Sequence, residues 1–231
     1  MASSSSSSPA APCRIVVMAS GSGSNFQALL DGLSSRTIRD AQIVRLFVNR
    51  KTAYAVTRAE KAGVPSEYFN MVAGGFQAKG EKDPERLREA RTKYDAALAE
   101  KVLAEQPDLV VLAGWMHVFT EGFLKPVADK GVRVINLHPA LPGRYDGAGA
   151  IERAYQDFQA GTLENNKTGI MIHYVIAEVD RGEPIMTREI ECREGETLQD
   201  LEQRIHSREH ELIVAATAKV VGGILAERTA R

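Results

Sequence analysis

The sequence has little cysteine and almost no net charge. Only two of its 231 residues are cysteines, Cys13 and Cys192, and no Cys-x-x-Cys pair occurs. This argues against a disulfide framework and against a thiolate zinc site, and it indicates a reducing compartment. The formal net charge of −1 provides no general attraction to nucleic acid or to an anionic membrane. We therefore expect a cytoplasmic protein that binds neither.

Long apolar runs are also missing. None approaches the ~20 residues of a membrane-spanning helix. The first residues are rich in Ser, Ala and Pro, and no apolar segment precedes Arg14. That composition suits neither a secretory signal nor an Arg-rich transit peptide, and it predicts a disordered leader over residues 1–12. The remaining length is enough for a substantial core in one large domain or two small ones.

Apolar segments alternate with helical patterns along the chain. The predicted order is βαβαβαβαβ followed by ββα, which indicates an α/β fold. We expect a doubly wound, mostly parallel, Rossmann-like sheet with an antiparallel C-terminal extension and a long C-terminal helix. Asp83 and Pro84 are typical of a helix start, and Thr197 to Asp200 resemble a capping box. Strands are expected over 14–19, 43–49, 64–69, 109–113, 132–138, 168–176 and 184–190; helices over 25–33, 52–63, 83–102, 121–130, 148–160 and 197–221.

The most informative segment is Val134-Ile135-Asn136-Leu137-His138-Pro139. Side chains two apart on a strand share a face, so Asn136 and His138 should point the same way. Pro139 cannot continue a hydrogen-bonded ladder and should end the strand. Ligands of open α/β sheets bind at this carboxyl edge. The plainer interpretation is a turn in which both side chains are merely satisfied polar groups.

A second motif, Ser20-Gly21-Ser22-Gly23-Ser24-Asn25, follows the first strand and opens the first helix. Glycine permits close backbone approach, and free N–H groups at a helix start favour an anion. The motif lacks the third glycine of a dinucleotide fingerprint and the lysine of a P-loop. It predicts a phosphate site, although a tight turn without a ligand has the same pattern.

Three further features have competing interpretations. Asp180 is either an ordinary acidic turn or a carboxylate that pairs with His138 and favours its charged form. Trp115 is either an aromatic plug over the core or one wall of a ligand pocket. His206-Ser207-Arg208-Glu209-His210 matches H-x-x-E-H, but a third metal ligand well downstream is missing. We expect a polar helix face there and no metal.

These motifs together resemble the phosphoribosylglycinamide formyltransferases, from Arg14 to about Val221. The resemblance rests on V-V-M-A-S-G-S-G-S-N, D-L-V-V-L-A-G-W-M, V-I-N-L-H-P-A-L-P, T-G-I-M-I-H-Y-V and E-V-D-R-G-E-P-I-M, in this order. It implies a single domain over residues 13–231, and a monomer or homodimer. The implied substrates are the small molecules 10-formyltetrahydrofolate and 5-phosphoribosylglycinamide. The implied activity belongs to de novo purine (IMP) biosynthesis.

The resemblance also implies residue roles. Asn136, His138 and Asp180 match the family's catalytic Asn, His and Asp. Gly23, Ser24 and Asn25 match its phosphate-holding residues, and Glu209 matches an acid that contacts the glycinamide substrate. The folate-contacting positions correspond to Arg91, Met116, His117, Val118, Phe119, Asn136, Ile176, Ala177, Glu178, Val179 and Asp180.

The chain departs from the family pattern at several positions. His117 stands where many members have Arg, and His206 lies at a variable position near the phosphate site. Three other functions are considered. A deformylase would use water in place of the amine, and a methionyl-tRNA formyltransferase would carry an RNA-binding domain. A non-catalytic nucleotide-binding module would leave Asn136, His138 and Asp180 unexplained.

Overall fold

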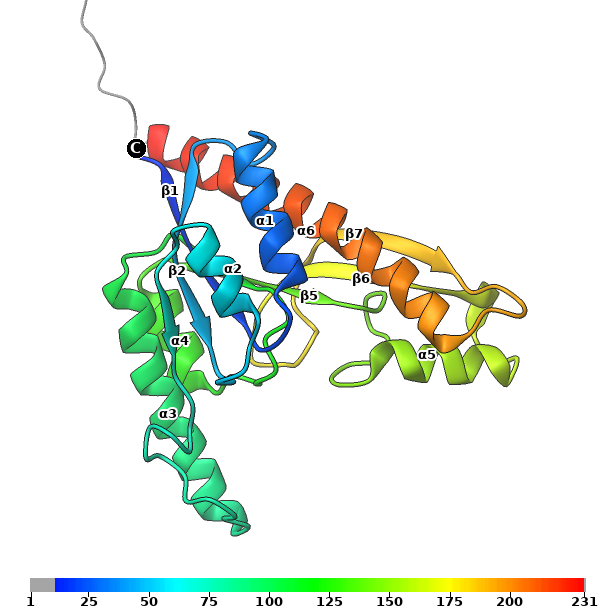
Figure 1. Ribbon diagram of the computed structural model, residues 1–231, viewed down its shortest axis with the longest axis horizontal. Helices are drawn as coiled ribbons and strands as arrows, with labels where there is room; N and C mark the ends of the chain where they lie inside the picture. Colours follow the sequence, from blue (N-terminus) through cyan, green and yellow to red (C-terminus); the bar gives the residue numbers. More distant parts are fainter. Residues whose placement is uncertain (1–10, 231) are drawn as a thin grey trace, which may run out of the picture.

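The computed structural model of the chain describes residues 11–230. The predicted leader therefore lies almost wholly outside the described residues. Seven strands form one sheet in the order β3-β2-β1-β4-β5-β6-β7 (Figure 1). The first five are parallel, and β6 and β7 join antiparallel, which confirms the predicted fold class. The strands are β1 Cys13–Ala19, β2 Ala41–Val48, β3 Ser66–Tyr68, β4 Leu109–Leu112, β5 Arg133–His138, β6 Lys167–Tyr174 and β7 Pro184–Glu191.

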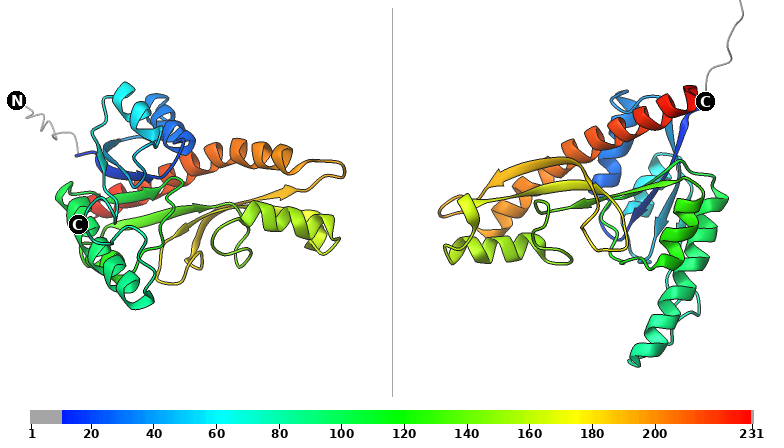
Figure 2. Two further views of the ribbon diagram at one scale, coloured as in Figure 1. Left: turned by 60° about the horizontal axis from the view of Figure 1, so that its bottom comes forward. Right: turned by 180° about the vertical axis from the view of Figure 1, so that it is seen from behind.

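Helices cover both faces of the sheet, as the nearly continuous apolar runs of β1 and β4 require. One core cluster joins the sheet to α1, α2, α5 and α6, and the other joins it to α3 and α4. In Figure 2 the pair α3 and α4 stands together at one end of the molecule. The helices are α1 Ser24–Ser34, α2 Ala55–Lys61, α3 Pro84–Ala104, α4 Glu121–Asp129, α5 Ala150–Gln159 and α6 Leu198–Thr229.

Two of the predicted helix starts are confirmed in atomic detail. The side chain of Asp83 accepts hydrogen bonds from the N–H groups of Glu85 and Arg86, and Pro84 is the first residue of α3. Thr197 and Asp200 form a reciprocal capping box at the start of α6. These caps satisfy helix N–H groups that have no partner within the helix, and each depends only on residues close in sequence.

Two predicted helix boundaries differ most from the structure. The last helix continues past Val221 to Thr229, because Ile224 is buried and its burial offsets the cost of Gly222 and Gly223 in a helix. The second helix begins at Ala55 rather than at residue 52, since the N–H of Ala55 donates to the carbonyl of Gly21 instead of to a helical neighbour. This contact ties α2 to the loop after β1.

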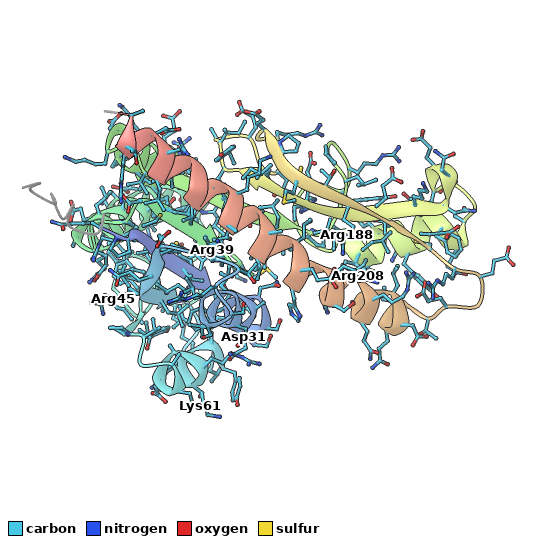
Figure 3. The ribbon with its side chains drawn as sticks, turned by 90° about the horizontal axis from the view of Figure 1, so that it is seen from above. Asp31, Arg39, Arg45, Lys61, Arg188 and Arg208 are labelled. Carbon is cyan, nitrogen blue, oxygen red and sulfur yellow. The ribbon has the colours of Figure 1, made fainter. Side chains whose placement is uncertain are left out.

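The long helix α6 crosses the sheet from the end of β7 to the beginning of β1 (Figure 1). Arg188 of β7 and Arg208 of α6, labelled in Figure 3, both donate to the carboxylate of Glu211. At the far end Arg228 donates to the carbonyl of Ala11. Within residues 11–230, no helix combines the length and the apolarity needed to cross a membrane.

Candidate active site

The carboxyl end of β5 brings together three of the predicted site residues. The Nδ1 atom of His138 lies 3.3 Å from Oδ2 of Asp180. The amide nitrogen of Asn136 donates to Oδ1 of the same carboxylate at 3.3 Å. Asn136 and His138 therefore point to one side of the strand, as their two-residue spacing predicted. Asp180 reaches them from the loop between β6 and β7.

Both ring nitrogens of His138 face hydrogen-bond acceptors. Nδ1 faces the Asp180 carboxylate, and Nε2 lies 3.3 Å from the backbone carbonyl oxygen of Arg144. A neutral imidazole has only one N–H, whereas the charged ring donates from both nitrogens. The side chain of His138 is only 4 % exposed, and an oxygen atom lies near each of its ring nitrogens.

Sequence reasoning missed His173 on β6. Its Nε2 atom lies 3.4 Å from Oδ1 of Asp180 and 3.3 Å from the amide nitrogen of Asn136. Its Nδ1 atom donates to the carbonyl of Tyr174 at 2.9 Å. A lone imidazole within the apolar run of β6 was the available signal. Its partner could not be read from the sequence, because Asn136 and His173 meet only through the antiparallel register of β5 and β6.

The Asp180 carboxylate is held in its charged form. Burial alone would raise its pKa, but the hydrogen bond from His173, the N–H of Gly147 at 2.8 Å and the nearby His138 outweigh burial and lower the pKa from its ordinary 3.8. The backbone of Asp180 is left-handed, with φ of 56°. Aspartate adopts this conformation more readily than most non-glycine residues.

The loop that carries Asp180 depends on a close approach at Gly182. A Cβ atom on Gly182 would lie 1.6 Å from the carbonyl oxygen of Tyr174. This same oxygen accepts the hydrogen bond from His173. Glycine at residue 182 therefore lets the loop turn back tightly enough to bring Asp180 against His138 and His173.

The glycine-rich loop forms the start of α1 as predicted. Gly23 is the residue before the helix and has a φ of 70°, and it offers no side chain to cap the first N–H groups. A Cβ atom on Gly23 would lie 2.7 Å from the Cβ of Ala55 in α2. Ser24 lines a groove of about 680 Å³ between α1, α2 and α6, where Arg58 supplies a positive charge. Arg58 also donates to the carbonyl of Ser22 at 2.9 Å.

Asn25 and Glu209 meet from opposite ends of the chain. The amide of Asn25 donates to the Glu209 carboxylate at 3.1 Å, and the two residues are 8 % and 5 % exposed. Oδ1 of Asn25 has no partner among the described residues. Glu209 thus faces the glycine-rich loop. His206, three residues earlier on α6, is exposed, and within residues 11–230 no three His, Cys, Asp or Glu side chains converge as a metal site would require.

The predicted folate-contacting residues divide into an exposed set and a buried set. Met116, Val118, Ile176 and Val179 are 68 %, 48 %, 43 % and 37 % exposed, which is unusual for large apolar side chains. Ala177 and Glu178 are exposed between Ile176 and Val179, and Arg91 is exposed on α3.

The buried set consists of His117 and Phe119, whose side chains point into the protein from the segment after β4. Nε2 of His117 lies 2.6 Å from Oδ1 of Asp95, whose other oxygen accepts the N–H of Thr120 at 2.6 Å. Phe119 is 7 % exposed and stacks on Phe123, with ring centroids 3.9 Å apart. Trp115 is also 7 % exposed and belongs to the core cluster, as the aromatic-plug interpretation predicted.

The chain is similar in sequence to known formyltransferases. The family model described as "Formyl transferase" matches residues 13–217. A phosphoribosylglycinamide formyltransferase of Schizosaccharomyces pombe is 41 % identical over 208 residues, which cover 90 % of this chain and 96 % of the relative. A protein of the same name from Saccharomyces cerevisiae is 41 % identical over 216 residues, covering 90 % and 97 %.

Solved structures agree with these relatives. Glycinamide ribonucleotide transformylase 1 of Symbiobacterium toebii superposes with a TM-score of 0.75 at 30 % identity, covering 95 % of this chain and 94 % of the other. The Geobacillus kaustophilus protein of that name gives a TM-score of 0.73 at 30 % identity, covering 91 % and 99 %. On the family model, these relatives and the shared fold, the chain belongs to the formyl transferase family.

Proposed function

We propose that this protein transfers the formyl group of 10-formyltetrahydrofolate to the amine of 5-phosphoribosylglycinamide, a step of purine biosynthesis in the cytoplasm. The observation that carries the proposal is the cluster of Asn136, His138 and Asp180 at the carboxyl edge of the sheet. The names of the curated relatives support the same substrate.

The proposed chemistry is direct transfer. The substrate amine attacks the formyl carbon, and the carbonyl oxygen becomes negative as a C–N bond forms. Asn136 donates a hydrogen bond to this oxygen, and the charged His138 donates from Nε2 in place of its long contact with the Arg144 carbonyl. As the C–N10 bond breaks and the carbonyl re-forms, N10 of the folate takes a proton from the charged His138, which then accepts the proton released by the amine. Alternatively, an ordered water carries that proton from the amine to N10.

Asp180 supports this step through His138. Its carboxylate lies 3.3 Å from Nδ1 and orients the ring through this ion-pair contact, and its negative charge stabilises the charged imidazole. His173 and the N–H of Gly147 keep the carboxylate in place and ionised. Thus the residues that touch the reacting atoms are Asn136 and His138, whereas Asp180 acts through the imidazole.

The two substrates occupy different parts of one domain over residues 13–231. The N-terminal half holds the phosphate at Gly23, Ser24 and Asn25, where the helix start favours an anion. Glu209 accepts from the glycinamide portion beside Asn25, since a buried carboxylate with few donors favours an amine or a hydroxyl.

The C-terminal half binds the folate and carries the catalytic cluster. Met116, Val118, Ile176 and Val179 supply apolar surface for the folate, with Ala177 and Glu178 between the last two. The side chains of His117 and Phe119 face inward, so these two residues contact the folate through their backbone. Arg91 supplies a cation for the acidic end of the folate.

The alternative is a deformylase in which water replaces the amine. Its expected product is formate, and the names of the curated relatives do not favour it. The deciding experiment incubates the purified protein with 10-formyltetrahydrofolate, with and without the amine. We expect formylated product only when the amine is present. Release of formate at an equal rate without the amine would refute the transfer reaction in favour of hydrolysis.

A further inference from the structure

Two loops meet over the catalytic cluster through neighbouring residues. The loop after β5 contributes Asp146 and Gly147, and the loop between β6 and β7 contributes Asp180 and Arg181. Nε and Nη2 of Arg181 each lie 2.6 Å from Oδ2 of Asp146. We call this ion pair the inter-loop clamp. Beside it, the N–H of Gly147 donates to Oδ2 of Asp180 at 2.8 Å.

On both loops, each clamp residue is the chain neighbour of a residue in the contact network of His138. Asp146 precedes Gly147 directly, and Arg181 follows Asp180 directly. The carboxylate oxygen that accepts from Gly147 is also the one that faces Nδ1 of His138. Consecutive Cα atoms are ~3.8 Å apart, so each clamp residue lies directly beside Gly147 or Asp180, the two residues that contact each other next to His138.

One of the two loops is anchored independently of the clamp. Arg153 of α5 donates to the carbonyl oxygens of Tyr145 and Asp146 at 2.5 and 2.8 Å. The hydroxyl of Tyr145 donates to Asp157 at 2.6 Å. These contacts fix Asp146 to α5, and the carbonyl of Arg144 in the same loop faces His138. The loop after β5 is therefore the fixed side of the clamp.

The other loop is the more exposed side of the clamp. Its residues from Ile176 to Val179 are exposed, and Asp180 has a left-handed backbone conformation. Arg181 adds a second connection to the fixed side, beside the hydrogen bond from Gly147 to Asp180. The side chains of Arg181 and Asp146 are 53 % and 30 % exposed, and exposed ion pairs contribute little to the free energy of unfolding. We therefore expect the pair to act by holding its chain neighbours, Gly147 and Asp180, in position.

We propose that Asp146 and Arg181 are positioning residues for the formyl transfer, holding Asp180 against His138 and the exposed apolar residues of the same loop toward the folate. The inference rests on the proposed function and adds two residues to it. Both the turnover rate and the binding of the folate then depend on this one ion pair. The phosphate-bearing amine is held elsewhere, by the start of α1 and Glu209, so its binding is expected to be independent of the clamp.

The test is a double-mutant cycle with Asp146→Asn, Arg181→Gln and both together. Misplacement of a catalytic group by a fraction of an ångström lowers the rate steeply, so each single variant should lose about 10-fold in kcat. The double variant should lose about 10-fold as well, because the second change removes an interaction already lost. The KM for the folate should rise in all three, while the KM for the amine stays within about 2-fold.

The matched control is the Lys167–Glu189 pair, a 2.7 Å ion pair between β6 and β7 with exposed side chains. Lys167→Gln and Glu189→Gln should leave all kinetic constants unchanged. Arg181→Lys, which keeps the charge, should recover most of the lost kcat. A double variant that loses about 100-fold, or single variants equal to an active wild type, would overturn the proposal.

Failure of the proposed function has a different outcome, namely a wild-type protein that forms no formylated amine. In that case, the His138 Nδ1 proton resonance in NMR spectra tests without an activity assay whether Asp146 and Arg181 position Asp180 against His138. We expect it to broaden or shift in the Asp146→Asn and Arg181→Gln variants and to stay unchanged in the Lys167→Gln control. Identical resonances in all of these proteins would refute a positioning role.

Discussion

Replacement of Asp180 by Asn tests the electrostatic basis of the proposed mechanism. The N–H of Gly147 can only donate, so the new amide should keep its oxygen at the Oδ2 position, where His138 also points. The shape and the His138 contact are then preserved. The negative charge is lost, and so is the hydrogen bond that Oδ1 accepts from Asn136, because an amide nitrogen replaces that oxygen. At the 3.3 Å separation from Nδ1, a unit charge contributes ~1–5 kcal/mol at effective dielectric constants of 80 to 20.

A value near the middle of this range, ~3 kcal/mol, corresponds to a loss of about 150-fold in kcat. The assay is steady-state formylation at saturating concentrations of both substrates, with the thermal midpoint measured in parallel. Glu183→Gln is the control, because Glu183 is an exposed carboxylate of the same loop. A kcat within about 3-fold of wild type would show that the carboxylate does not stabilise a charged His138 in the transition state, and the mechanism would be wrong.

Three other predictions concern packing, binding and pH. Gly182→Ala should destabilise the fold by about 1–3 kcal/mol or more and abolish turnover, since its Cβ would overlap a carbonyl oxygen; Gly222→Ala, in an open helical position, should instead stabilise by about 0.5–1 kcal/mol in urea unfolding. Glu209→Gln should raise the KM for the amine at least about 10-fold and leave the folate KM unchanged, and equal effects on both would contradict the assignment. The pKa of Asp180 is lower in the folded state than its ordinary value of 3.8. The ionised carboxylate therefore stabilises the fold fully above pH 3.8, and this stabilisation is lost as the pH falls through the lowered pKa. The unfolding midpoints of the wild type and of Asp180→Asn should converge only below the lowered pKa.

Local features were predictable because their causes lie close together in the sequence. The Asp83 cap, the Thr197 capping box and the turn at Gly23 each involve residues within a few positions of one another. The shared face of Asn136 and His138 likewise follows from the geometry of one strand.

Contacts that depend on how distant elements meet were not predictable. His173 meets Asn136 only because β5 and β6 pair in one register, and a shift by one residue would turn its ring to the opposite face. The ring of His117 turns inward to Asp95, which is fully buried. No pattern near His117 indicates a partner that lies 22 positions earlier on α3.

The contact between Asn25 and Glu209 has a consequence for biosynthesis. It joins residues 184 positions apart, one from the first helix and one from the last. During translation the glycine-rich loop emerges long before its partner, so a nascent chain that ends before α6 carries this loop but lacks Glu209. If the two residues have the proposed roles, the complete amine site forms only after the last helix has been synthesised and has packed against the first.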